Sequence, residues 1–530
     1  MIKAHFLRDW SLTILGLITG LIVANAQVTK ELPANFDAYV EKVMKEFEVP
    51  GMSIAIVKNN KTLLTKGYGI KQLHSSQKVD EHTLFPIASN SKAFTATLLA
   101  LLVEEGKITW DSPVINYLPW FRMNDPYVTA NMTVRDLLVH RSGLGPYAGD
   151  LLQFPPSTYS REEIVKKVKF LPLTTSFRNA YAYDNILYLA AGELIKEVTG
   201  KEWEECIQDR ILKPLGMTGT VSRISSFGTA NNTSASHARF DGEIREVKNF
   251  LQYGVSDITN PAGGIASNAT DMAKWLITQL DSGRAANGHV LYKKVTATEL
   301  WKGVTPMPVA KLADHIKPAQ MEYQSYALGF YTYNYRSERI VAHGGKLDGF
   351  VSRVVMVPSL NLGISILTNQ ESGGAIAAIV HQLIDHALKV PAFDWISGYK
   401  KEQEAGFERI RKIEATAVQE RNEKSQPSLP LQKYTGRYND KWYGDVLITL
   451  EQGRLVVNFS HNPGMIGDVE HWQYDTFIVR WRNREFKADA YITFSLNADG
   501  SIDHTKMKAV SPMTDASYDF HDLYLKPVIK

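Results

Sequence analysis

A serine and a lysine three residues apart could supply a nucleophile and its proton acceptor. Ser89 and Lys92 stand at the start of a strongly apolar segment. Residues at this spacing share one face of a helix, so the lysine amine can reach the serine oxygen. Serine is a weak nucleophile until a neighbouring group accepts its proton, and the pair therefore predicts nucleophilic catalysis. The same S-x-x-K spacing occurs twice more, which we interpret as surface coincidences: Ser75 with Lys78, and Ser397 with Lys400.

Two further motifs carry side chains that can move protons or hold a substrate. A Tyr-Asp-Asn motif at residues 183–185 directly precedes an apolar helical pattern over 186–199. A His-Gly-Gly motif at 343–345 ends a β-rich run. Either motif alone is more often structural than catalytic. Their order along the chain, together with Ser89 and Lys92, favours one shared site.

Regular elements are expected around each motif. Apolar periodicity predicts helices beginning at Ser89 and at Ile186, and two more over 270–280 and 375–388. β-rich segments predict strands at 52–57, 62–68, 327–335, 339–343, 349–358 and 363–369. Because strands occur at both ends of this unit and helices lie between them, we expect an α+β fold. Its antiparallel sheet is built from both ends of the unit, flanked by helices, and a helical region is inserted.

The C-terminal part of the chain changes character. Residues 400–424 are rich in charge with one apolar helical stripe, and residues 425–430 resemble a linker. Short alternating strands follow at 446–450, 455–459, 476–481 and 491–496, which predict an all-β, barrel-like domain. The predicted organisation is a signal peptide at 1–26, a catalytic domain at 27–395, a charged helix with linker at 396–430, and the β-domain at 431–530.

The N-terminus predicts export. Lys3 and Arg8 precede an uncharged, mostly apolar run over 12–23, and Ala24-Asn25-Ala26 forms a small-residue cleavage site. This is the pattern of a secretory signal peptide with Gln27 as the first mature residue. The apolar run is short of the ~20 residues that span a bilayer, so no membrane segment is expected after cleavage. We expect a periplasmic or secreted protein.

Composition narrows the classes of function. The chain has 530 residues, a net charge of +3 and no basic cluster, so nucleic-acid binding is not expected. Its single cysteine, Cys206, excludes an intrachain disulfide and a cysteine-cluster metal site. No metal or cofactor is expected, and the expected partner is a small-molecule or peptide acyl substrate.

The ordered motifs carry a family resemblance. S-x-x-K, then Y-x-N, then a K-T-G or H-x-G strand motif resembles class C β-lactamases and DD-peptidase-type penicillin-binding proteins, whose relatives include esterases, D-aminopeptidases and acyltransferases. Three more stretches are similar to family signatures, at 137–144, 214–217 and 261–264. The resemblance covers about residues 35–390. The β-domain resembles the lipocalin-like domain appended to some members.

The resemblance implies a role for each motif residue. Ser89 would be the acylated nucleophile, Lys92 its proton partner, and Tyr183 the general base and later acid. The residues implied in substrate binding and the oxyanion hole are Asn185, His343, Gly344, Gly345 and Lys346. A cationic Lys92 nearby is expected to lower the pKa of Tyr183.

One departure from the β-lactamase pattern affects the expected substrate. His343-Gly344-Gly345 stands where β-lactamases have Lys-Thr/Ser-Gly, so the fixed cation and the hydroxyl that help bind a substrate carboxylate are absent. A histidine is charged only part of the time near neutral pH. The motif resembles the esterase and D-aminopeptidase branches, and β-lactams are expected to be poor substrates.

These observations favour an exported serine hydrolase that forms an acyl-enzyme with an ester or amide. Transfer of the acyl group to a hydroxyl or amine is an open alternative. A second alternative, from another class, is a non-catalytic receptor on the same fold. The joint presence of Ser89, Lys92 and Tyr183 argues against the receptor, because a receptor needs no base.

Overall fold

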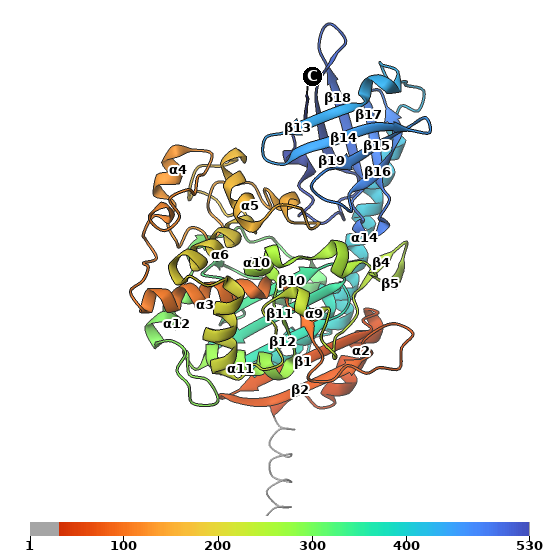
Figure 1. The fold of residues 1–530 in the computed structure, drawn as a ribbon. Coiled ribbons are helices and arrows are strands. Elements are labelled where there is room, and N and C mark those ends of the chain that lie inside the picture. Colours follow the sequence, from red (N-terminus) through yellow and green to blue (C-terminus); the bar gives the residue numbers. More distant parts are fainter. Residues whose placement is uncertain (1–30, 529–530) are drawn as a thin grey trace, which may run out of the picture.

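The computed structural model describes residues 31–528 (Figure 1). The predicted signal peptide and its cleavage before Gln27 lie outside the described residues. Within the described part of the chain, none of the helices combines the length and the apolar character that a bilayer crossing requires.

An eight-stranded sheet forms the centre of the first unit, with the strand order β2-β1-β12-β11-β10-β9-β8-β7. Strand β1 pairs antiparallel with β12, so the N-terminal hairpin completes a sheet whose other strands come from residues 305–368. The predicted assembly of one sheet from both ends of the unit is therefore confirmed. The strands are β1 (Gly51–Lys58), β2 (Lys61–Gly69), β7 (Thr305–Pro306), β8 (Gln324–Tyr326), β9 (Tyr331–Tyr335), β10 (Glu338–Leu347), β11 (Phe350–Val357) and β12 (Leu362–Thr368).

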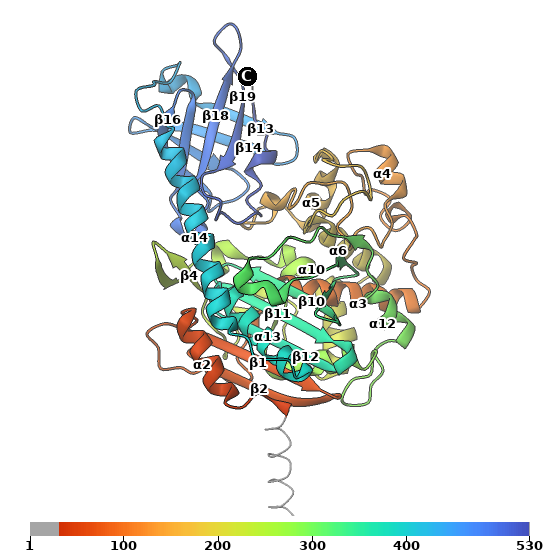
Figure 2. The same ribbon diagram turned by 180° about the vertical axis from the view of Figure 1, so that it is seen from behind.

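Helices cover both faces of this sheet (Figures 1 and 2). Helices α2 (Phe36–Glu46) and α13 (Gly373–Leu388) pack with one face into a common hydrophobic core. Helices α3 (Ser91–Glu104) and α11 (Ala269–Leu280) belong to the larger core on the other face. Strand β1 is buried at every position from Gly51 to Val57, as a strand covered on both faces must be.

The inserted region between β2 and β7 is mainly helical. Its α-helices besides α3 and α11 are α4 (Pro126–Asn131), α5 (Arg161–Lys167), α6 (Ile186–Thr199), α7 (Trp203–Ile207), α8 (Lys213–Leu215), α9 (Ile224–Phe227), α10 (Asn260–Gly263) and α12 (Lys294–Leu300). Two small antiparallel pairs interrupt them: β3 (Phe85–Pro86) with β6 (Ala266–Ser267), and β4 (His237–Phe240) with β5 (Glu243–Glu246).

The long helix α14 (Trp395–Gln419) runs from the first unit to a second eight-stranded antiparallel sheet (Figure 2). Thr505 and Leu525 exchange two backbone hydrogen bonds, of 2.8 and 3.1 Å, so this sheet nearly closes into a barrel. Its strands are β13 (Gly436–Asp440), β14 (Gly444–Glu451), β15 (Arg454–Phe459), β16 (Ile466–Gln473), β17 (Thr476–Trp481), β18 (Ala490–Leu496), β19 (Ile502–Ala509) and β20 (Lys526–Pro527). The predicted barrel-like domain is confirmed.

Candidate active site

Ser89 lies in a tight turn rather than at the first position of a helix. The turn is a 3₁₀ segment, Ala88–Asn90, and helix α3 begins at Ser91, so the predicted helix start at Ser89 is wrong by two residues. Ala88 has a φ of 48°, in the left-handed region that a helix cannot continue through. This backbone holds Ser89 at the edge of a cavity that its side chain lines.

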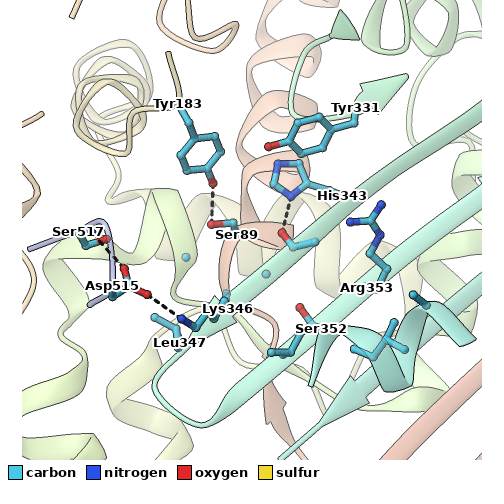
Figure 3. Close-up of a pocket in the computed structure, with 18 of the residues that line it drawn as sticks. Ser89, Tyr183, Tyr331, His343, Lys346, Leu347, Ser352, Arg353, Asp515 and Ser517 are labelled. Carbon is cyan, nitrogen blue, oxygen red and sulfur yellow. Dashed lines mark hydrogen bonds and ion pairs between the residues drawn. The ribbon is translucent and has the colours of Figure 1, made fainter. Parts of the chain in front are cut away.

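Two predicted partners meet the serine oxygen, and Figure 3 shows the hydrogen bond with one of them, Tyr183. Tyr183 Oη donates a hydrogen bond of 2.8 Å to Ser89 Oγ, and Lys92 Nζ lies 3.1 Å from the same atom. Tyr183 comes from the loop before α6, whereas Lys92 lies in the first turn of α3. The structure therefore brings together three side chains that the sequence separates by up to 94 positions.

Lys92 is completely buried, and its amine has three polar neighbours. Besides Ser89 Oγ, Nζ lies 2.7 Å from Asn185 Oδ1 and 2.8 Å from the carbonyl oxygen of Ala262. Ala262 belongs to the signature-like stretch at 261–264, whose backbone thus holds the lysine. Burial lowers the pKa of Lys92 to about 7, against a partial upward effect of Asp150 and Asp184.

Tyr183 differs from the sequence expectation in its electrostatics. We expected Lys92 to lower the pKa of this phenol, but burial raises the pKa of Tyr183 well above its ordinary value, and the hydrogen bond with Ser89 offsets only part of this rise. The ring is part-buried against the His140 and Tyr147 rings, where a phenolate is solvated less well than in water. Tyr183 is therefore a neutral phenol at rest, and of the two groups that contact Ser89 Oγ, Lys92 is the one whose pKa lies near neutrality.

Asn185 connects Lys92 to a buried carboxyl group that the sequence did not reveal. Asn185 Nδ2 donates a 2.7 Å hydrogen bond to Asp150 Oδ2, and Gln153 Nε2 donates one of 2.8 Å to the other oxygen. Burial raises the pKa of Asp150 to about 7. With its amide fixed between lysine and carboxyl, Asn185 can orient the lysine amine toward Ser89.

His343 lines the cavity, but both of its ring nitrogens are already engaged. Nδ1 lies 2.6 Å from the Gly344 carbonyl, and Nε2 lies 2.9 Å from Tyr326 Oη. Because a carbonyl only accepts, Nδ1 carries the proton and Nε2 accepts from the phenol. Burial lowers the pKa of His343 well below its ordinary value, so the expectation of partial charge near neutral pH is wrong.

Gly345 and Lys346 place strand β10 against the turn that holds Ser89. A Cβ at Gly345 would lie 2.2 Å from the Ile87 carbonyl, so only glycine lets the strand approach this closely. Lys346 follows on the strand, and its amine forms an ion pair of 3.0 Å with Asp515 Oδ2 (Figure 3). The Lys346 side chain is thus engaged with the C-terminal unit, and only its backbone is available for the predicted role beside Ser89.

The C-terminal unit contributes to the same cavity, which the sequence analysis missed. Asp515, Ser517 and Tyr518 line it, and Asp519 accepts hydrogen bonds from the amides of Gly149 and Leu151, at 2.6 and 3.0 Å. These amides flank Asp150, so the β-domain supports the segment that holds the buried carboxyl. No local sequence pattern marks residues 515–519, because their importance arises only from contacts made across the two units.

The cavity has a volume of about 930 Å³ and extends beyond the immediate surroundings of Ser89. Tyr147, Tyr181 and Tyr331 give the cavity an aromatic wall, and the Tyr147 ring lies 5.4 Å from that of Tyr183 between centres. This volume suits a substrate of drug-like size or larger, such as an acylated small molecule or a short peptide.

Comparisons with known proteins agree with this architecture. Residues 36–389 match the family described as Beta-lactamase, and residues 420–527 match a domain of unknown function (DUF3471). The unguisins hydrolase ungD of Aspergillus violaceofuscus is 29% identical over 79% of this chain and 77% of its own length. Protein flp of Staphylococcus aureus strain MRSA252 is 25% identical over 71% of each chain.

Solved structures show the same fold at low sequence identity. The octameric penicillin-binding protein homologue from Pyrococcus abyssi superimposes with a TM-score of 0.58 at 18% identity, covering 93% of this chain and 99% of that chain. SurE superimposes with a TM-score of 0.54 at 18% identity, covering 95% and 100%. The fold, the ordered motifs and a family match over more than half of its length show that this chain belongs to the Beta-lactamase family.

Proposed function

We propose that this protein is an exported serine hydrolase that acts on an ester or amide through an acyl-enzyme on Ser89. The observation that carries the proposal is the double contact on one oxygen: Tyr183 Oη at 2.8 Å and Lys92 Nζ at 3.1 Å from Ser89 Oγ. A nucleophile within reach of two proton-transfer groups, in a cavity, is the arrangement that acyl transfer chemistry needs.

In the proposed acylation step, Lys92 is the proton acceptor. Its pKa of about 7 leaves much of the amine neutral at neutral pH, and its other two neighbours, Asn185 Oδ1 and the Ala262 carbonyl, only accept. The lone pair of the neutral amine is then directed at the Ser89 hydroxyl. Ser89 Oγ bonds to the acyl carbon while its proton passes to Nζ.

Tyr183 is proposed as the acid that completes this step. As a neutral phenol it donates to Ser89 Oγ at rest, and it protonates the leaving oxygen or nitrogen as the acyl bond breaks. One proton transfer between the lysine and the phenolate restores their starting states. Water then attacks the acyl carbon while its proton passes to the neutral Lys92 amine, and Tyr183 protonates Ser89 Oγ as the acyl–oxygen bond breaks. A second proton transfer from Lys92 to the phenolate restores the resting site, and the backbone N–H groups of Ser89 and Lys346 are proposed to stabilise the oxyanion.

The names of two similar proteins favour hydrolysis over acyl transfer as the proposed reaction. Two similar fungal proteins, both named as unguisins hydrolases, are 29% identical to this chain over about four fifths of its length. The β-lactam class is proposed to be disfavoured because the neutral His343 supplies no cation for a substrate carboxylate. A panel of aryl esters, D-amino-acid amides and benzylpenicillin, assayed with and without an added amine acceptor, tests both preferences.

The central test is the chemistry of Ser89 itself. The mature protein is mixed with 4-nitrophenyl butyrate and with a fluorophosphonate, and intact mass and peptide mapping follow. We expect a burst of nitrophenol and one adduct on Ser89, both abolished in Ser89→Ala. The matched control is Ser75→Ala, which removes the serine of another S-x-x-K sequence and should retain both. Turnover that survives Ser89→Ala unchanged refutes the assignment.

A further inference from the structure

One arginine lies on the face of the central sheet that is turned away from Ser89. In the register of β10 and β11, Gly345 is opposite Ser352, and Gly344 is opposite Arg353. Ser352 Oγ donates a 2.6 Å hydrogen bond to the Ile87 carbonyl, beside the turn that holds Ser89. Successive side chains of a strand point to opposite faces, so Arg353 points toward the face covered by α13 and α14.

Gly344 leaves room for this guanidinium. A Cβ at Gly344 would lie 3.2 Å from Arg353 Nη1, tighter than an ordinary contact. Arg353 Nη2 donates a 3.2 Å hydrogen bond to Tyr333 Oη. Among residues 31–528 no carboxylate forms an ion pair with Arg353, although a guanidinium offers five donors. Among the described residues, the Tyr333 hydroxyl is the one hydrogen-bond acceptor of this guanidinium.

Arg353, labelled in Figure 3, lines the same cavity as Ser89, and we name the part of the cavity around it the rear chamber. It is defined by Tyr333, Arg353, Ile376, Val380, His381 and Tyr399, all of which line the cavity. Its aromatic wall is stacked: the His381 ring lies 4.7 Å from Tyr335 and 5.7 Å from Tyr399 between ring centres. Ile376 and Val380 add an aliphatic surface from α13.

The charges around the rear chamber leave Arg353 uncompensated. Burial lowers the pKa of His381 to about 3, so this ring is neutral, and its Nδ1 is already bonded to Tyr399 Oη at 2.7 Å. The other nearby arginine, Arg336, is paired with Asp385 at 2.9 Å. A guanidinium in a low-dielectric pocket binds a carboxylate strongly, because the pair is charge-assisted and can be bidentate.

We propose that the rear chamber binds a carboxylate with an aromatic or apolar body, independently of the acyl substrate at Ser89. Charge complementarity selects the anion, and the stacked rings with Ile376 and Val380 accommodate the body. Arg353 and Ser89 line one continuous cavity, but Arg353 projects from the face of the sheet opposite to that of Ser352, so occupancy of the rear chamber does not require a reactive serine. This binding site goes beyond the proposed hydrolase function.

The test uses the full mature protein carrying Ser89→Ala, so that turnover cannot contribute to the signal. Calorimetric titration with 4-phenylbutyrate should give saturable binding of one molecule. The neutral analogue 4-phenylbutan-1-ol should bind about tenfold more weakly or worse, since it lacks the charge that the guanidinium recognises. Arg353→Gln should weaken binding of the carboxylate by a similar factor, Arg353→Lys should restore part of it, and Ile376→Trp should abolish it by filling the chamber.

The matched control is Arg411→Gln, which removes an exposed arginine of α14 paired only with Glu408 and should leave binding unchanged. Circular dichroism of each variant verifies folding. Equal binding of acid and alcohol, binding that survives Arg353→Gln, or no saturable binding overturns the proposal. Esterase activity is assayed separately, in the protein that retains Ser89. The two proposals can therefore fail independently: if Ser89 proves not to be the nucleophile, the titration result for the rear chamber still stands.

Discussion

Lys346 of β10 and Asp515 of the C-terminal unit form an ion pair of 3.0 Å, although 169 positions separate them. Lys346 directly follows the His-Gly-Gly motif, and Asp515 lines the cavity that holds Ser89. The β-domain therefore supplies one wall of the candidate active site, and substitutions in it should affect substrate binding.

Asp515→Asn should change KM more than kcat. The pair is partly exposed, with 49% and 35% of the two side chains accessible, so its loss should cost less than about 1 kcal/mol of stability. Loss of a charge from the cavity wall should nevertheless alter substrate affinity. Steady-state kinetics and urea unfolding measure the two effects. Asp503→Asn, a barrel residue beside His504, is the control, and an equal effect of both variants on KM would contradict a specific role for Asp515.

The pH dependence of kcat/KM should reflect the protonation state of Lys92. The neutral amine of Lys92 is the proposed proton acceptor, and its pKa is about 7. We therefore expect kcat/KM to rise about tenfold per pH unit below that value and to level off above it. Lys92→Met should remove most activity, whereas the exposed Lys78→Met, from another S-x-x-K sequence, should retain it. A flat profile between pH 5 and 8 would exclude Lys92 as the base.

Tyr183→Phe should lower kcat by about 10²–10⁴-fold, the usual size of a general acid–base contribution. The ring itself should stay in place, since it packs 4.4 Å from His140 and 5.4 Å from Tyr147 between centres. The melting temperature should therefore change little. Tyr117→Phe, which removes a distant hydroxyl, is the control. Unchanged kcat in Tyr183→Phe would transfer the acid role to another group.

Asp184→Asn should stabilise the protein more at pH 8 than at pH 5. Burial raises the pKa of this carboxyl from 3.8 to about 7, so over that interval the folded state holds a proton that the unfolded state has released. Stability therefore falls as pH rises through the interval, and an amide does not share this loss. The melting temperatures of the parent protein and of Asp184→Asn, measured at pH 5 and pH 8, test this prediction. Asp314→Asn, which changes an exposed carboxyl group, is the control. An effect of the variant that is equal at both pH values would refute the assignment.

The sequence by itself predicted most of the elements of the first unit and the candidate reactive groups. Alternating and helical periodicities are local, so they located β1, β2, α6 and four of the eight barrel strands; β13, β16, β19 and the two-residue β20 escaped because their patterns are weaker or shorter. The ordered motifs placed Ser89, Lys92 and Tyr183 in one site before any coordinates. The spacing of Ser89 and Lys92 predicted their contact because one helical turn brings residues three apart together. Tyr183 was added by the family resemblance.

Tertiary structure alone decided the electrostatics and the distant partners. Lys92, Tyr183 and His343 have shifted pKa values because the packed cores exclude water from them, and burial is a property of the whole fold. Contacts between segments far apart in the chain brought Asp150 and Asp515 to the site and placed Arg353 in the rear part of the same cavity. Local patterns report neighbours along the backbone, whereas charge state and cavity walls depend on what folding brings together in space.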